Sequence, residues 1–212
     1  MADQPSENLP AEVQLALAHT RPNLRDALRI FFELDMRLGR IVAATNEPML
    51  GQMRLAWWRD MLGTSVEDRP SGDAVLDGIG EHWAEREAEL VPLVDAWEHL
   101  LAEPPLSDAD AIGFAENRGQ ALLAIYGDKE GKDAAWHWAV ADLASKVSLD
   151  EERTMLVKLG LQGGASRSLP RQARGLAVLG ALGQRALKRG GRPLMEGRTA
   201  SLVALRAASF GR

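Results

Sequence analysis

Carboxylates three or four residues apart on a helix could hold Mg²⁺, because both side chains would face the same side of that helix. Mg²⁺ prefers oxygen ligands and can bridge them to a phosphate, so diphosphate chemistry would need two such helices facing each other. Acids at this spacing also line the solvated faces of ordinary helices, and we favour that interpretation for each candidate. The candidates are Asp73 with Asp77, Asp95 with Glu98, and the run Glu81, Glu85 and Glu89.

The other common catalytic signatures are weak or absent, although the sequence leaves a Ser/His/Asp triad open. The chain has no cysteine, which excludes disulfides, thiolate zinc sites and cysteine nucleophiles. Its four histidines stand alone, with no HExxH motif and no pair at metal-ligand spacing. There is also no GxSxG segment of the kind that positions a nucleophilic serine.

One segment, residues 47–60, combines charge with large aromatic side chains. It begins at Glu47 and places Trp57 and Trp58 between Arg54 and Arg59, and these five residues are the candidates for ligand binding. We expect a largely buried helix, because surface helices rarely carry so much aromatic area. A buried arginine needs a carboxylate or a phosphate as its partner. Acids of the chain that could serve are Glu33, Asp35, Asp60 and Glu116.

The elements that must position these residues are helices. Ala and Leu are abundant, β-branched residues are sparse, and no segment alternates with a period of two. We therefore expect an all-α, compact multi-helix bundle formed by one domain over residues 11–212, after a disordered N-terminus at 1–10. The tryptophans at 83, 97, 136 and 138 are expected in its core. The expected helices cover about 11–19, 23–44, 46–63, 73–80, 86–101, 107–127, 132–147, 149–159, 170–187 and 196–209.

Charge is distributed unevenly along the chain. The net charge is −5, yet residues 161–212 contain ten basic residues and a single acid, Glu196. These cations could pair with acids elsewhere in the chain, or could meet an anionic membrane surface or an acidic protein partner. We expect no nucleic-acid partner. The acidic N-terminus does not fit a signal or transit peptide, so we expect a cytoplasmic protein that could also lie at the periphery of the inner membrane.

Three segments carry a family resemblance. Residues 47–60 resemble the "SEPxxGxxRLxWWRDAL" stretch of the squalene/phytoene synthase superfamily, and residues 114–127 and 169–179 resemble two of its later helices. The chain is most similar to a divergent bacterial branch related to the mitochondrial complex I assembly factor with this fold. The resemblance implies a shortened bundle of the isoprenoid (terpenoid) synthase type.

The resemblance also implies where metal ligands should stand. The superfamily joins two prenyl diphosphates head to head, using two aspartate-rich motifs. The first would fall at residues 42–46, where alanine stands in place of the aspartate and Glu47 is the acid that remains; the second retains Asp142 alone. Without paired carboxylates the diphosphate cannot be held by metal ions. We therefore expect a pseudoenzyme that needs no cofactor and acts in binding an apolar or prenyl ligand, or in assembling a respiratory or membrane complex.

Two alternatives remain open from the sequence. In the first, the chain is an active Mg²⁺-dependent head-to-head prenyltransferase with relocated ligands, for which Glu47 and Asp142 are the weak metal candidates. In the second, the chain is an unrelated helical protein, and the tryptophan segment matches by chance.

Overall fold

The computed structural model describes residues 9–127, 129–164 and 167–211. Within these residues the chain forms α-helices joined by short loops and 3-10 turns, with no β-strand, which confirms the expected all-α class. The α-helices are α1 (Ala11–Ala18), α2 (Pro22–Ala43), α3 (Pro48–Gly63), α4 (Ala74–His82), α5 (Val91–Glu98), α6 (Asp108–Tyr126), α7 (Lys132–Lys146), α8 (Asp150–Leu161), α9 (Arg174–Lys188) and α10 (Ala200–Phe210).

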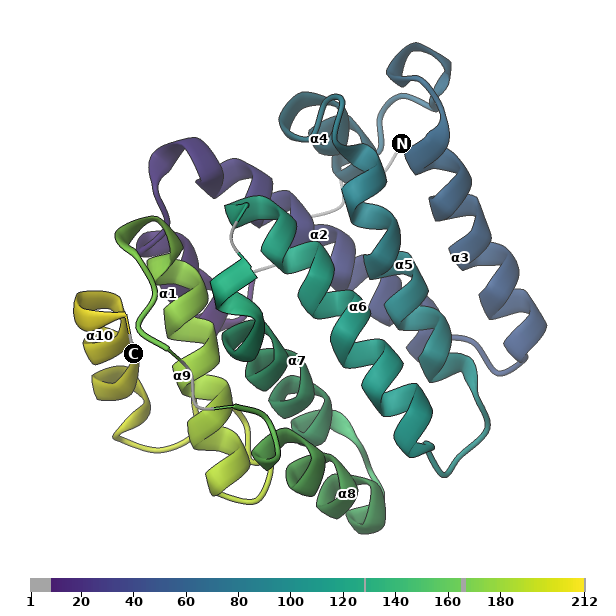
Figure 1. Cartoon of the computed structure of the whole chain (residues 1–212). Helices are drawn as coiled ribbons and strands as arrows, with labels where there is room; N and C mark the ends of the chain where they lie inside the picture. The colour runs from purple at the N-terminus through teal and green to yellow at the C-terminus, as the bar shows by residue number, and fades with distance from the viewer. Residues whose placement is uncertain (1–8, 128, 165–166, 212) are drawn as a thin grey trace.

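The helices form a bundle in which α6 and α7 lie in the middle, while α3 and α10 lie at opposite edges (Figure 1). Helix α7 packs against α6, α8 and α9, and α5 packs between α3 and α6. At the outer edges, α3 packs mainly on α5, and α10 packs mainly on α9. The two edge helices therefore each have a side that is turned away from the bundle.

The contact between α7 and α9 depends on small residues. A Cβ atom added to Gly183 would lie 2.5 Å from the carbonyl oxygen of His137, and one added to Gly180 would lie 2.6 Å from the Cα atom of Ala134. Both distances are too short for a real side chain, so glycine lets the two backbones approach closely. Close packing of this kind is sensitive to even one added carbon atom.

Aromatic rings fill the space between α2 and α7. Phe31 and Phe32 of α2 lie edge to face, with ring centroids 5.1 Å apart, and Trp138 of α7 lies 5.5 Å from Phe32. Trp138, Trp83 and Trp97 are buried, which confirms the prediction that they belong to the core. Trp136, the fourth of these tryptophans, is half-buried and lines a groove described below.

Several helix ends follow the local sequence. Ser107 caps α6, with its hydroxyl accepting a hydrogen bond from the Asp110 N–H at 3.1 Å, and Gly127 ends the same helix with φ of 61°. Helix α3 begins directly after Glu47. Residues 1–8 of the expected disordered N-terminus lie outside the described residues, and Leu9 packs against the core. In the described part of the chain, no helix has the length and apolar character required to cross a bilayer.

Candidate functional site

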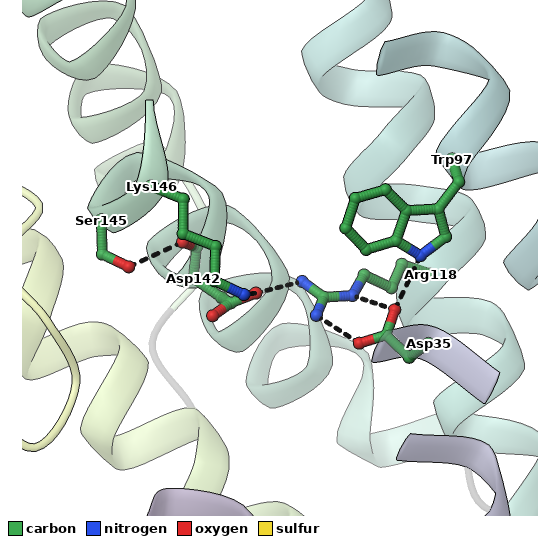
Figure 2. Close-up of polar contacts among 6 residues, drawn as sticks. All are labelled: Asp35, Trp97, Arg118, Asp142, Ser145 and Lys146. Atoms are coloured by element: carbon green, nitrogen blue, oxygen red, sulfur yellow. Dashed lines mark hydrogen bonds and ion pairs between the residues drawn. The ribbon is translucent and has the colours of Figure 1, made fainter. Parts of the chain in front are cut away.

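The centre of the bundle contains a charged cluster contributed by three helices. Arg118 of α6 lies between Asp35 of α2 and Asp142 of α7, as Figure 2 shows. The exposed fractions of these residues are 2%, 3% and 6%, respectively. Ionised groups are rarely buried to this extent unless they are paired. The three helices are thus connected through charges in the interior.

Each nitrogen of the Arg118 guanidinium donates a hydrogen bond to a carboxylate. Its Nε and Nη2 donate to the two oxygens of Asp35 at 3.0 and 2.6 Å, while Nη1 donates to Oδ2 of Asp142 at 2.7 Å. A paired, two-point contact between arginine and a carboxylate fixes the angle as well as the distance between the groups. Arg118 therefore holds two acids of facing helices at once.

Further donors complete the cluster on both sides. The indole Nε1 of Trp97 donates to Oδ1 of Asp35 at 2.9 Å, and Nζ of Lys146 donates to Oδ2 of Asp142 at 2.9 Å. The Lys146 side chain is 59% exposed, so the cluster extends from the core to the surface at that residue. We refer to Asp35, Trp97, Arg118, Asp142 and Lys146 as the arginine network (Figure 2).

Aromatic faces surround the guanidinium of Arg118. Its central carbon lies 4.1 Å from the ring centroid of Trp138 and 5.2 Å from that of Phe114. The ring quadrupole attracts a cation placed over its face, and the attraction is stronger where water is excluded. The rings thus add to the stabilisation that the carboxylates give.

The electrostatic environment keeps Arg118 and Asp142 ionised. Burial alone would lower the pKa of Arg118, but Asp35 and Asp142 outweigh it and raise the pKa above its usual value. Burial alone would raise the pKa of Asp142, but Arg118 and Lys146 outweigh it and lower the pKa below its usual value. At neutral pH Arg118 and Asp142 are therefore charged and balance each other.

The tryptophan segment forms most of α3. The sequence predicted a largely buried helix, and this prediction is wrong. Trp58 is buried at 3% exposure, whereas its neighbour Trp57 is 41% exposed. The reason is that α3 lies at the edge of the bundle, so only one of its sides contacts other helices (Figure 1). The two tryptophans point in different directions, and their rings meet edge to face with centroids 5.2 Å apart.

The two arginines of this segment also differ from the prediction. Arg59 binds Asp95 and, at 2.9 Å, Glu98, both on α5, so none of the four acids expected from the sequence is its partner. Arg54 is exposed, and its Nη1 donates a 3.4 Å hydrogen bond to the Thr45 hydroxyl. Arg59 therefore joins α3 to α5, and it does not need a phosphate to balance its charge.

Four large apolar side chains of α3 are exposed to solvent. Met49, Leu50, Met53 and Trp57 are 72%, 45%, 64% and 41% exposed. We call these four residues the α3 face. Methionine and tryptophan are enriched at protein–protein interfaces, and flexible methionine side chains adapt to differently shaped partners. Such a face is suited to binding another apolar surface.

The structure gives the metal-ligand candidates separate surroundings. Glu47 is exposed at the start of α3, whereas Asp142 is buried and bonded to Arg118 and Lys146. Asp73 caps α4 and pairs with Arg37 at 2.9 Å, while Asp95 and Glu98 bind Arg59. Among the described residues, no three His, Asp or Glu side chains are grouped so that they could hold one metal ion.

An open groove of about 590 Å³ runs along α6 and α7. Leu123 and Trp136 line it, together with the small residues Gly119 and Ala135. Its volume lies within the usual range for small-molecule sites. The groove is mostly apolar, and its polar lining residues are Glu89, Glu116, Gln120 and Lys132.

Sequence reasoning missed Arg118 as the centre of the arginine network. The signal was present, because Arg118 lies four residues after Phe114 and four residues before Leu122, on the buried side of its helix. A charged residue in the middle of an apolar stripe predicts a buried ion pair. Asp35 was named as a possible arginine partner, but it was assigned to the wrong arginine.

Comparison with known proteins finds no relative of this chain. No protein-family model, no curated protein and no solved structure matches the chain. The resemblance to the squalene/phytoene synthase superfamily therefore stays a prediction.

Proposed function

We propose that this chain is a squalene/phytoene synthase-like protein that has lost metal-dependent chemistry and acts by binding, in the assembly of a respiratory or membrane complex. The observation that carries the proposal is the position of Arg118. It lies between Asp35 and Asp142, and Asp142 is the acid that remains of the second aspartate-rich motif expected from the resemblance.

The charge balance around the two interior acids supports this proposal. A metal clamp on a diphosphate needs carboxylates whose oxygens are free to coordinate. Three oxygens of Asp35 and Asp142 accept hydrogen bonds from Arg118, and the Asp142 oxygen also accepts one from Lys146. A metal ion would have to displace a guanidinium that is already desolvated and neutralised, at a cost of several kcal/mol. This arrangement favours a structural role for the two acids.

Binding would use the surfaces that the bundle leaves open. The α3 face offers an exposed apolar surface for a protein partner. The groove along α6 and α7 has the size and apolar walls to accept an apolar or prenyl chain, with Lys132 available for an anionic end. The assembly role is an analogy at the level of the fold. A cytoplasmic location fits both this role and the charge pattern.

The catalytic alternative is tested by turnover. The purified chain is incubated with farnesyl or geranylgeranyl diphosphate and Mg²⁺, and both released diphosphate and prenyl products are measured. We expect no product above the level seen without protein. Mg²⁺-dependent product formation that is abolished by Glu47→Gln would overturn the proposal in favour of an active prenyltransferase, because Glu47 is exposed and its replacement leaves the core intact.

The binding role is tested by partner retention. The tagged chain and its Met53→Asp variant are cross-linked in native cells, and retained proteins are compared quantitatively. We expect a small set of membrane-complex proteins to be retained by the wild type and lost from the variant. Leu149→Asp is the matched control, since Leu149 is 38% exposed and lies outside the α3 face. Equal retention by all three proteins would count against the α3 face.

A further inference from the structure

The outermost helix, α10, has two unlike sides. Its buried side consists of Ala200, Ala204 and Ala207, which pack towards α9. On its other sides, large apolar side chains are open to solvent: Leu202 and Phe210 are each 66% exposed, and Leu205 is 59% exposed. Leu202 and Leu205 are three residues apart, so they lie on one face of the helix, opposite the alanines.

Cations surround this apolar face. Arg206 is exposed on α10 itself, and Arg198 is exposed two residues before the helix begins. At the other end, the Leu169 N–H donates to the Gly211 carbonyl oxygen at 3.0 Å, which places the segment carrying Arg167 and Arg171 beside the end of α10. The face is therefore flanked by positive charge at both ends.

These cations are not neutralised within the described chain. None of the ion pairs between described residues includes a basic residue of 167–211. Arg185 and Arg189 donate to the backbone carbonyl of Glu196. Glu196 is half-buried as a residue, and its Oε2 is buried without a hydrogen-bond partner. The exposed basic residues of this region are Arg167, Arg171, Lys188, Arg189, Arg192, Arg198 and Arg206.

The combination favours one kind of partner. Short helices that bind at a bilayer surface present bulky apolar side chains between basic ones, so that the apolar groups enter the lipid while the cations meet its headgroups. A second copy of the chain is disfavoured as the partner. A two-fold interface through α10 would bring Arg206 close to the same arginine of the other copy. The α3 face differs, since α3 carries acidic Asp60 as well as basic Arg54 and begins directly after acidic Glu47.

We propose that α10 docks this protein on an anionic phospholipid surface, with Leu202, Leu205 and Phe210 entering the headgroup boundary and the surrounding arginines contacting lipid phosphates. The inference goes beyond the proposed function and does not depend on it, because a membrane-docked protein could be catalytic or not.

The test is co-sedimentation of the full chain with vesicles. Phosphatidylcholine vesicles with and without phosphatidylglycerol are compared, at low and high salt. The wild type is expected to bind only the phosphatidylglycerol vesicles, and less tightly at high salt. Arg198→Gln with Arg206→Gln is expected to weaken binding roughly 25-fold, since each arginine near such a surface contributes about fivefold. Leu202→Ser with Leu205→Ser is expected to abolish binding.

The matched control is Met49→Ser with Met53→Ser, which removes equally exposed apolar groups from α3 and is expected to leave vesicle binding unchanged. Circular dichroism checks that every variant keeps the helical content of the wild type. The proposal is overturned if the α10 variants bind vesicles as well as the wild type does, or if phosphatidylcholine alone binds equally. It is also overturned if the wild type does not bind vesicles but forms a dimer or binds polyglutamate, and the α10 variants lose that dimerisation or that binding.

Discussion

The interior of the bundle and its two edge helices differ in the side chains that they pair and expose. Inside, Arg118 has its charge balanced by acids from two other helices. At the edges, Met53 on α3 and Leu202 on α10 are more than half exposed. Charged groups are thus satisfied where chemistry would be expected, and apolar groups are left open where partners can reach them. The contrast favours binding at the surface over reaction in the centre.

The strongest test of this contrast is to remove the central cation. Arg118→Met should lower the free energy of unfolding by about 3–5 kcal/mol, because Asp35 and Asp142 would remain buried without a partner. Urea unfolding followed by circular dichroism measures the loss. Adding Asp35→Asn and Asp142→Asn to Arg118→Met should recover part of the stability. A loss below about 1 kcal/mol for Arg118→Met alone would mean that the network does not hold the interior together.

A smaller effect is expected from one added carbon in the interior. Gly183→Ala places a Cβ atom 2.5 Å from the carbonyl oxygen of His137, so α7 and α9 must move apart. We expect a loss of about 1–3 kcal/mol in the free energy of unfolding. The control is Gly63→Ala at the end of α3, where a Cβ atom meets nothing within 4 Å and the substitution should not destabilise. Equal effects at the two sites would contradict the close packing of α7 and α9.

Acid should weaken the interior in a predictable direction. The pKa of Asp142 is lowered in the folded state, so below the usual aspartate value of about 3.9 the unfolded chain binds more protons than the folded chain. The stability from its ionised form is therefore present above that pH and is lost as pH falls through the folded-state pKa. Unfolding measured from pH 6 down to about pH 2 should show this loss, and Asp142→Asn should show a shallower dependence on pH.

The smallest effects on stability are expected at the edges. Met53→Ser on α3 and Leu205→Ser on α10 should each change the free energy of unfolding by less than about 0.5 kcal/mol, because both side chains are mostly exposed. Thermal unfolding compares them with the wild type. A large loss at either site would show that the side chain is packed against the protein, and would remove that helix from the proposed binding surfaces.

The sequence predicted the helices well because their signals are local. Ser107 and Gly127 mark the ends of α6, and apolar residues repeat with the helical period along α2. Those signals depend on neighbours in the chain, so they can be recognised without the fold. The all-α class follows from the same information.

The arrangement of the candidate site could not be predicted in the same way. Arg59 and its partner Asp95 are 36 residues apart, and Arg118 and Asp35 are 83 residues apart, so only the packing of helices brings them together. The exposure of Trp57 depends on the position of α3 at the edge of the bundle, which periodicity alone does not give. Which arginine meets which acid is a property of the tertiary structure.

The central claim is that the interior acids serve Arg118 and do not serve a metal ion. Electron paramagnetic resonance of Mn²⁺, added to the chain with inorganic diphosphate as a substitute for the prenyl diphosphate headgroup, tests this claim directly. The account predicts a signal equal to that of Mn²⁺ and diphosphate without protein. A saturable site that disappears in Asp142→Asn, with the helical content of that variant unchanged, would contradict it.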